Sequence, residues 1–175
     1  MHAPGVLVPR PTSLTHDAAL TAASGFLAVL AITTTMYLLP AVGLPQVDLP
    51  IWIARLFVSG PVAVGALGLA VHLAVGLAYA WLYVTRVEPR LAASPAVAGL
   101  TYGLALWGFA QVVAVPLLGA AGHALASGPA VTPGVLSWHL GAGAAAASLC
   151  AHASYGLVLG WVYGCHGGGS CRRVA

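Results

Sequence analysis

Four long stretches of uncharged, mostly apolar residues dominate this sequence and tie the chain to a membrane. The stretches span residues 18–39, 61–84, 95–118 and 144–164, and none of them contains Asp, Glu, Arg or Lys. A helix needs about 20 predominantly apolar residues to cross roughly 30 Å of hydrocarbon, and each stretch is long enough. A membrane β-barrel would instead show segments of about ten residues with alternating polarity. The sequence therefore predicts an all-α membrane protein with four transmembrane helices.

The composition excludes the other classes of chain. Of 175 residues, 60% are apolar and 5% are charged, whereas about a quarter of the residues in a soluble domain are charged. Disordered chains are poor in apolar residues, which these figures also exclude. The basic pI comes from six arginines and no lysine, and it gives no indication of nucleic-acid binding. We expect a single transmembrane domain over residues 1–175, with the lipid bilayer as its surroundings.

The arginines predict how the chain is oriented. Short cytoplasmic loops carry an excess of basic residues. Five arginines fall on one side of the predicted spans and only Arg55 falls on the other; the five are Arg10, Arg86, Arg90, Arg172 and Arg173. The pattern predicts a multi-pass protein of the bacterial cytoplasmic (inner) membrane with both termini in the cytoplasm.

The two loops that would then face outward, 41–60 and 119–143, are not ordinary polar loops. Residues 51–58 form an apolar stretch with one Arg and one Trp. Such a segment suits either a position along the headgroup layer or packing over the helix ends. Trp138 in the second loop is a candidate anchor at the interface.

The second and fourth spans resemble each other. Residues 72–83 read HLAVGLAYAWLY and residues 152–163 read HASYGLVLGWVY, so that His72, Gly76, Leu77, Trp81 and Tyr83 all recur 80 residues later. This match predicts two parallel two-helix repeats, about 18–84 and 95–164. They would be related by a pseudo-two-fold axis along the membrane normal. The second and fourth helices then run in the same direction.

Small residues recur every four positions along these two spans. Such stripes mark close helix packing in membranes, within the bundle or between two copies of the chain. The candidate packing residues are Gly68, Gly76 and Ala80 in the second span and Gly156, Gly160 and Gly164 in the fourth. His72 and His152 belong to the same stripes. Each precedes an interfacial Trp by nine residues, about 14 Å along a helix. We expect both imidazoles near the bilayer midplane, pointing into the bundle.

Three interpretations of the paired histidines stay open. In the first, each ring only makes a hydrogen bond, to a backbone carbonyl, to Gln111 or to the other histidine, as buried polar groups generally do. In the second, His72 and His152 bind a cofactor or metal and supply both axial ligands of a b-type haem, since axial ligands are a main determinant of haem chemistry. In the third, they belong to a proton or small-solute carrier, although the spans offer no acid for a relay.

Other polar residues are weaker candidates. His139 lies in an outward loop and is a possible additional metal ligand with His152, without the spacing of a known metal motif. Thr33, Thr34 and Thr35 can donate to the carbonyl groups of their own helix. The sequence contains no catalytic triad pattern, phosphate-binding loop or paired carboxylates, so we predict no catalytic residues and no enzyme.

The order of these motifs resembles a known family. HLAVGLAYAWLY in the second span, GLTYGLALWGFAQVVAVPLLG in the third and HASYGLVLGWVYG in the fourth are similar to the YagU-like group of small bacterial inner-membrane proteins, over residues 65–165. The resemblance implies a multi-helix membrane protein and carries over no activity and no site residue. The favoured function is a non-catalytic subunit or accessory protein of a larger membrane assembly, in contact with other membrane proteins or with itself. A haem- or metal-carrying module is the first alternative and a carrier is the second.

Overall fold

The computed structural model describes residues 14–125 and 133–166 of the chain, with side chains from Asp17 onward. All regular elements in these two ranges are helical. The first half contains α1 (Leu14–Leu38), η1 (Leu39–Val42), α2 (Leu49–Arg55), α3 (Pro61–Leu82), η2 (Tyr83–Val87) and η3 (Glu88–Arg90). The second half contains α4 (Pro95–Phe109), η4 (Ala110–Ala114), α5 (Val115–Ala124), η5 (Val135–Leu140) and α6 (Ala142–His166).

Four helical segments are long and apolar enough to cross a membrane, as the sequence predicts. They cover Asp17–Val42, Pro61–Arg90, Pro95–Ala124 and Ala142–His166. The third is longer than expected because η4, a π-helical turn, joins α4 to α5 without a break. A single π-helical turn inside an α-helix changes its direction without exposing backbone groups. This protein is therefore a candidate multi-pass membrane protein with a helical bundle.

Proline and glycine set the helix ends. Pro61 and Pro95 occupy the first turns of α3 and α4, where the missing N–H of proline costs nothing. At the other end of α1, Pro40 lies in the short 3₁₀ turn η1, and Gly43 follows with a positive φ of 82°. That left-handed conformation favours glycine, and it turns the chain toward α2.

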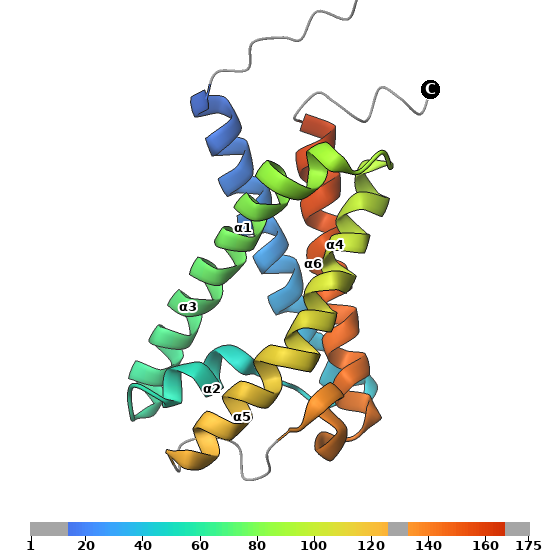
Figure 1. Ribbon diagram of the computed structural model, residues 1–175. Coiled ribbons are helices and arrows are strands. Elements are labelled where there is room, and N and C mark those ends of the chain that lie inside the picture. Colours follow the sequence, from blue (N-terminus) through green and yellow to red (C-terminus); the bar gives the residue numbers. More distant parts are fainter. Residues whose placement is uncertain (1–13, 126–132, 167–175) are drawn as a thin grey trace, which may run out of the picture.

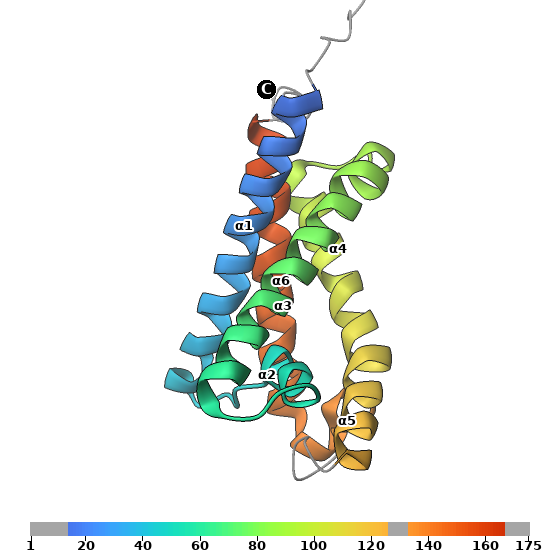
Figure 2. The same ribbon diagram turned by 90° about the vertical axis from the view of Figure 1, so that its left-hand side faces the viewer.

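The helices pack in the order α3, α1, α6 and α4, with α1 against both α3 and α6. Figures 1 and 2 show α3 and α6 running in the same direction, with the first residues of α1 and the last residues of α6 at the same end of the bundle. Near that end α3 approaches α4. There the Tyr102 hydroxyl of α4 donates to the Tyr79 carbonyl of α3 at 2.8 Å. Toward the opposite end α3 diverges from α4 and α5, and α2 lies across the space between them.

A close backbone contact with glycines at its centre joins α4 to α6. A Cβ atom on Gly99 would lie 2.7 Å from the Cα of Gly160, and one on Gly156 would lie 2.9 Å from the Cα of Gly103. The two backbones thus touch along two turns, as expected for small residues at a membrane helix interface. Gly164 continues the stripe against the ring of Pro95. The stripe predicted on the fourth span therefore packs inside the bundle, against the third span.

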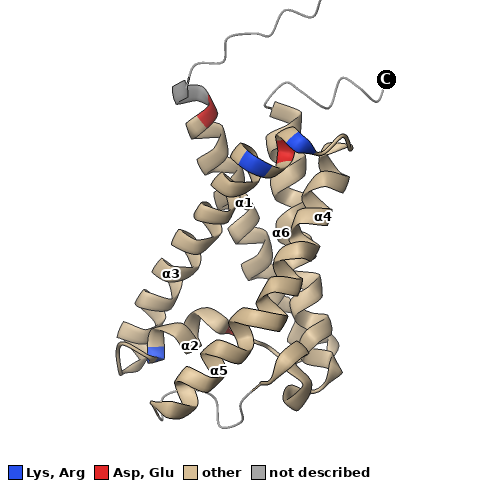
Figure 3. Ribbon diagram, viewed as in Figure 1, with Lys and Arg blue, Asp and Glu red and all other residues tan. Residues whose placement is uncertain are grey.

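The charged residues of the described chain lie at the two ends of the bundle (Figure 3). Arg86, Glu88 and Arg90 are on the short turns between α3 and α4, at the end that holds the start of α1. Arg55, at the end of α2, lies at the opposite end. The length between the ends is apolar, as a bundle surrounded by lipid requires. Arg10, Arg172 and Arg173 lie outside the described residues.

Replacement of Gly156 by alanine tests the backbone contact between α4 and α6. The added methyl group has to displace the backbone of Gly103, so we expect a loss of about 1–3 kcal/mol, as for overpacked cores. The measurement is the thermal unfolding midpoint in detergent.

Gly108 on α4, the helix that Gly156 packs against, is the control, because a Cβ atom there meets nothing within 4 Å. Alanine at position 108 should leave stability unchanged or raise it by up to about 1 kcal/mol, the difference in helix propensity. Equal effects of the two substitutions would contradict the packing described above.

Candidate functional site

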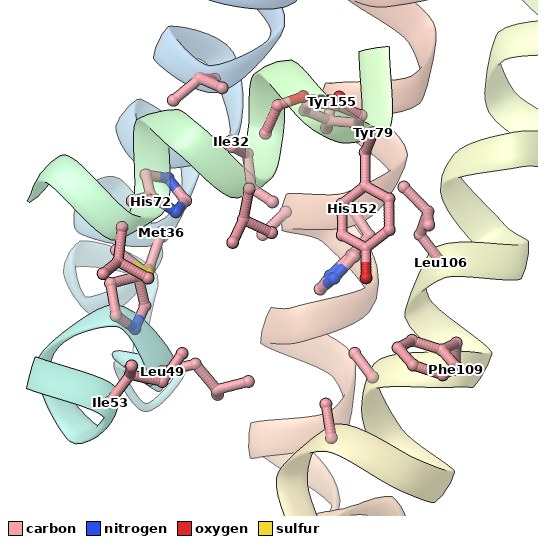
Figure 4. A pocket seen from close by; sticks show the side chains of 18 of the residues that line it. Ile32, Met36, Leu49, Ile53, His72, Tyr79, Leu106, Phe109, His152 and Tyr155 are labelled. Atoms are coloured by element: carbon pink, nitrogen blue, oxygen red, sulfur yellow. Dashed lines mark hydrogen bonds between the residues drawn. The ribbon is translucent and has the colours of Figure 1, made fainter. Parts of the chain in front are cut away.

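A pocket of about 320 Å³ lies where α3 diverges from α4 and α5. All four spans and α2 contribute to its walls, and most of the side chains are apolar (Figure 4). Ligand sites usually occupy about 300–1,000 Å³, and a dry cavity of about 150 Å³ already binds benzene. The residues that line the pocket are Val29, Ile32, Met36, Leu49, Pro50, Ile53, Val71, His72, Val75, Gly76, Tyr79, Leu106, Phe109, Ala110, Ala114, Leu118, Ala151, His152 and Tyr155.

The short helix α2 closes one end of this pocket. Asp48 is its N-cap: one carboxylate oxygen accepts from the Ile51 backbone N–H at 3.1 Å, and the other accepts from the Tyr37 hydroxyl on α1 at 3.1 Å. The helix rests on α3 at Gly68, where an added Cβ would lie 3.2 Å from the Pro50 carbonyl oxygen. The structure shows residues of this segment packed on α3, and a position along the headgroup layer stays a prediction.

Both predicted histidines line the pocket, His72 from α3 and His152 from α6. Each lies near the middle of its helix. Figure 4 shows the two rings on different walls of the same space, with Tyr79 and Tyr155 also at the pocket. The structure thus brings together the two residues that the 80-residue match singles out.

The hydrogen bonds of His152 determine where its proton is. Its Nδ1 lies 2.8 Å from the backbone carbonyl oxygen of Ser148. A carbonyl oxygen can only accept, so Nδ1 carries the hydrogen and donates it. In the neutral ring, Nε2 is then an unprotonated acceptor. No described residue donates a hydrogen bond to it.

The hydrogen bonds of His72 lead to the opposite tautomer. Its Nε2 lies 2.9 Å from the hydroxyl oxygen of Thr33, and that hydroxyl lies 2.7 Å from the Val29 carbonyl oxygen. The single hydrogen of Thr33 is donated to the carbonyl, because two oxygens at that distance repel without one. His72 therefore donates from Nε2 to Thr33, and its Nδ1 is an acceptor that has no hydrogen bond within the described ranges.

Thr33 has a contact that the sequence did not predict. It donates to its own helix as expected, but it also fixes the ring of a residue on a different span. A run of three threonines inside an apolar span was the sequence feature that could have indicated a polar contact with another span. Gln111, an expected partner of the histidines, instead accepts from the Ser137 hydroxyl at 2.8 Å in a buried contact between η4 and η5.

The small residues predicted on the second span contact two different elements. Gly76 and Ala80 contact α1. Gly76 faces the side chain of Val29, and the Cβ of Ala80 lies 2.7 Å from where a Cβ on Gly25 would be. Gly68 meets α2 instead. The Tyr155 hydroxyl of α6 donates to the Gly76 carbonyl at 2.6 Å, which joins the two spans next to the pocket.

The remaining metal candidate is not brought to the pocket. His139 lies on η5 beside Gly134. In residues 14–125 and 133–166 there is no group of three or more His, Cys, Asp or Glu side chains placed to hold a metal ion. The geometry therefore offers two imidazoles in a shared apolar pocket.

Comparison of the chain with protein-family models, with curated proteins and with solved structures found no match. The similarity to the YagU-like group stays a prediction, and the pocket is the structural feature that bears on function.

The contact between Thr33 and His72 gives a direct test of this hydrogen-bond network. In the Thr33→Val variant the shape is kept, but the His72 N–H loses its acceptor. We expect a destabilisation of about 1–3 kcal/mol, the cost of an unsatisfied buried donor. The measurement is thermal or denaturant unfolding of the purified protein.

Thr101→Val serves as the control, because the exposed Thr101 hydroxyl also donates to its own helix, at 2.8 Å from the Val97 carbonyl oxygen, without contacting another span. Its effect should stay within about 0.5 kcal/mol, as for other surface substitutions. If both threonine variants behave alike, the ring of His72 is not held as described.

Proposed function

We propose that this chain is a non-catalytic membrane protein that holds a small apolar molecule in the pocket between its spans. We propose further that it does so as a subunit or accessory protein of a larger membrane assembly. The observation that carries the first part is the pocket of about 320 Å³, whose walls are mostly apolar and include two histidines. An apolar cavity with a few convergent polar groups is the usual form of a ligand site.

The pocket is placed for access from lipid. Val75 on α3 and Phe109 at the end of α4 both line it, and their side chains are 45% and 49% exposed. In a bundle that spans a bilayer, exposed side chains at this depth face acyl chains. A lipid-soluble molecule therefore reaches the pocket sideways between α3 and α4, without crossing the bundle.

A variant that fills the pocket tests this function. Ala114 lines the pocket, so Ala114→Phe should exclude a bound molecule. Native mass spectrometry of protein released from detergent should show a discrete bound mass on the wild type that is lost in the variant.

The matched control is Ala120→Phe, at an exposed position of α5 that does not line the pocket, and it should keep the bound mass. Indistinguishable spectra for wild type and Ala114→Phe would rule out the pocket as the binding site.

One observation favours haem or metal binding as a second candidate. A ligating imidazole usually donates its other N–H to a carbonyl or carboxylate, and His152 does so through Nδ1 to Ser148. His152 thus fits the role of a ligand through Nε2. The Nε2 atom of His72 donates to Thr33, so His72 would ligate a metal through Nδ1, and ligation through Nε2 of both rings would require His72 to leave Thr33.

An optical spectrum of the reduced protein, together with metal analysis, separates the two candidates. A haem module gives b-type absorption and one iron per chain, both lost in His152→Ala. The first candidate predicts a colourless, metal-free protein. A proton or solute carrier receives less support, because no Asp or Glu belongs to the described lining of the pocket.

We propose that the spans arose as two parallel repeats, and the helix contacts support this. In the first pair Gly25 meets Ala80, and Val29 meets Gly76; in the second pair Gly99 meets Gly160, and Gly103 meets Gly156. The two α4 residues lie 74 positions after the two α1 residues, and the two α6 residues lie 80 positions after the two α3 residues. A common register of contacts is expected if one helix pair was duplicated.

For orientation we propose that both termini face the cytoplasm of a bacterial cell, on the basis of the arginine distribution. Single cysteines at Ser59 and Ala93, in connections at opposite ends of the bundle, test it after the native cysteines are replaced. A membrane-impermeant thiol reagent should label Ser59→Cys in intact cells and Ala93→Cys only after lysis. The reverse pattern would invert the orientation.

A further inference from the structure

We propose that the molecule held in the pocket carries a hydrogen-bond donor, and that it is a lipid-soluble phenol or alcohol whose hydroxyl group donates to Nε2 of His152. This inference rests on the proposed function, since it names the chemical class of the ligand for the same pocket. It follows from the direction of the hydrogen bonds around the two histidines.

Each imidazole has one ring nitrogen that accepts no hydrogen bond from a described residue. The Ser148 carbonyl takes the Nδ1 hydrogen of His152, and Thr33 takes the Nε2 hydrogen of His72. Each ring is neutral, because a charged imidazolium among lipid is costly and needs a partner, and the described lining of the pocket has no acid. Nε2 of His152 and Nδ1 of His72 can then only accept hydrogen bonds.

An acceptor that faces an apolar pocket gains from a donor, and no described residue donates a hydrogen bond to Nε2 of His152. A ketone, ester or ether has only acceptors and leaves this nitrogen unsatisfied, which costs binding free energy. A hydroxyl group satisfies it. Tyr79 also lines the pocket (Figure 4), and its hydroxyl is suited to donate to the oxygen of the same ligand.

The shape of the pocket indicates the rest of the ligand. A volume of about 320 Å³ is roughly twice that of a cavity that accepts benzene, which leaves room for one six-membered ring and a few further carbons. The exposed Val75 and Phe109 mark the side at which an apolar tail leaves for the bilayer. A phenolic ring with an alkyl or isoprenoid tail, such as a hydroquinone, fits this description.

The test compares two probes, 4-nonylphenol and its methyl ether 4-nonylanisole, in which a methyl group replaces the hydrogen of the donor. The wild-type protein in lipid nanodiscs is titrated with each probe at matched mole fractions in the bilayer, and the thermal unfolding midpoint is followed. We expect the phenol to bind about tenfold more tightly than the ether, the effect of one hydrogen bond.

The variants His152→Leu and His123→Leu locate the effect. His152→Leu should lower phenol affinity to that of the ether and leave the ether unchanged. His123 is exposed on α5 and does not line the pocket, so His123→Leu should behave as wild type. The wild-type comparison alone decides the question if His152→Leu does not fold.

Three results would overturn the proposal. Equal affinities of the wild type for phenol and ether mean that the pocket binds apolar molecules without selecting a donor, so the ligand class falls while the proposed function stands. A preference for the phenol that persists in folded His152→Leu also removes His152 as the acceptor. If neither probe binds to the wild type, both the ligand class and the proposed function fail.

Discussion

The contact of bare backbone between α4 and α6 is the constraint on which the rest of this bundle depends. Gly99 and Gly103 lie directly against Gly160 and Gly156, so no side chain separates the two backbones there. Helices in lipid gain nothing from burying apolar surface against one another, and close van der Waals contact is what holds them. α1 packs along the other side of α6 and carries α3. α3 packs against α1 and α2 and diverges from α4 and α5, and the pocket lies in the space between them.

The polar groups inside the bundle are organised around that divergence. Tyr102 and Tyr155 donate to the carbonyls of Tyr79 and Gly76 on α3, and they tie the closed end of the bundle together. At the pocket, two histidines use their ring N–H groups locally: His72 donates to Thr33 and His152 donates to the Ser148 carbonyl. A purely structural role for these histidines does not explain why Nδ1 of His72 and Nε2 of His152 are left without donors at an apolar pocket. This arrangement supports the ligand that we propose for the pocket.

Much of this architecture can be predicted from the sequence. Each span is a separate run of apolar residues, so their number and approximate limits follow from length and charge alone. The location of His72 and His152 at one shared site also follows, because their positions match within similar helices. What joins them could not be predicted in the same way. α1 is apolar around most of its circumference, so nothing in its sequence indicates that Thr33 faces α3. The π-helical turns η2 and η4 are each followed by a proline, Pro89 and Pro116, which disturbs the helical ladder. That signal does not tell a break from a continuous helix, and η4 extends the third span to Ala124 and directs α5 toward α2.

Two neutral histidines hold opposite tautomers and present acceptors to one pocket, and nitrogen NMR can observe both tautomers. Protein labelled with ¹⁵N in the histidine rings reports which nitrogen of each ring carries hydrogen, and single His→Gln variants assign the signals. The account predicts hydrogen on Nδ1 of His152 and on Nε2 of His72, with the other nitrogen of each ring unprotonated. A spectrum that shows hydrogen on Nε2 of His152, or on both nitrogens of either ring at neutral pH, would contradict it.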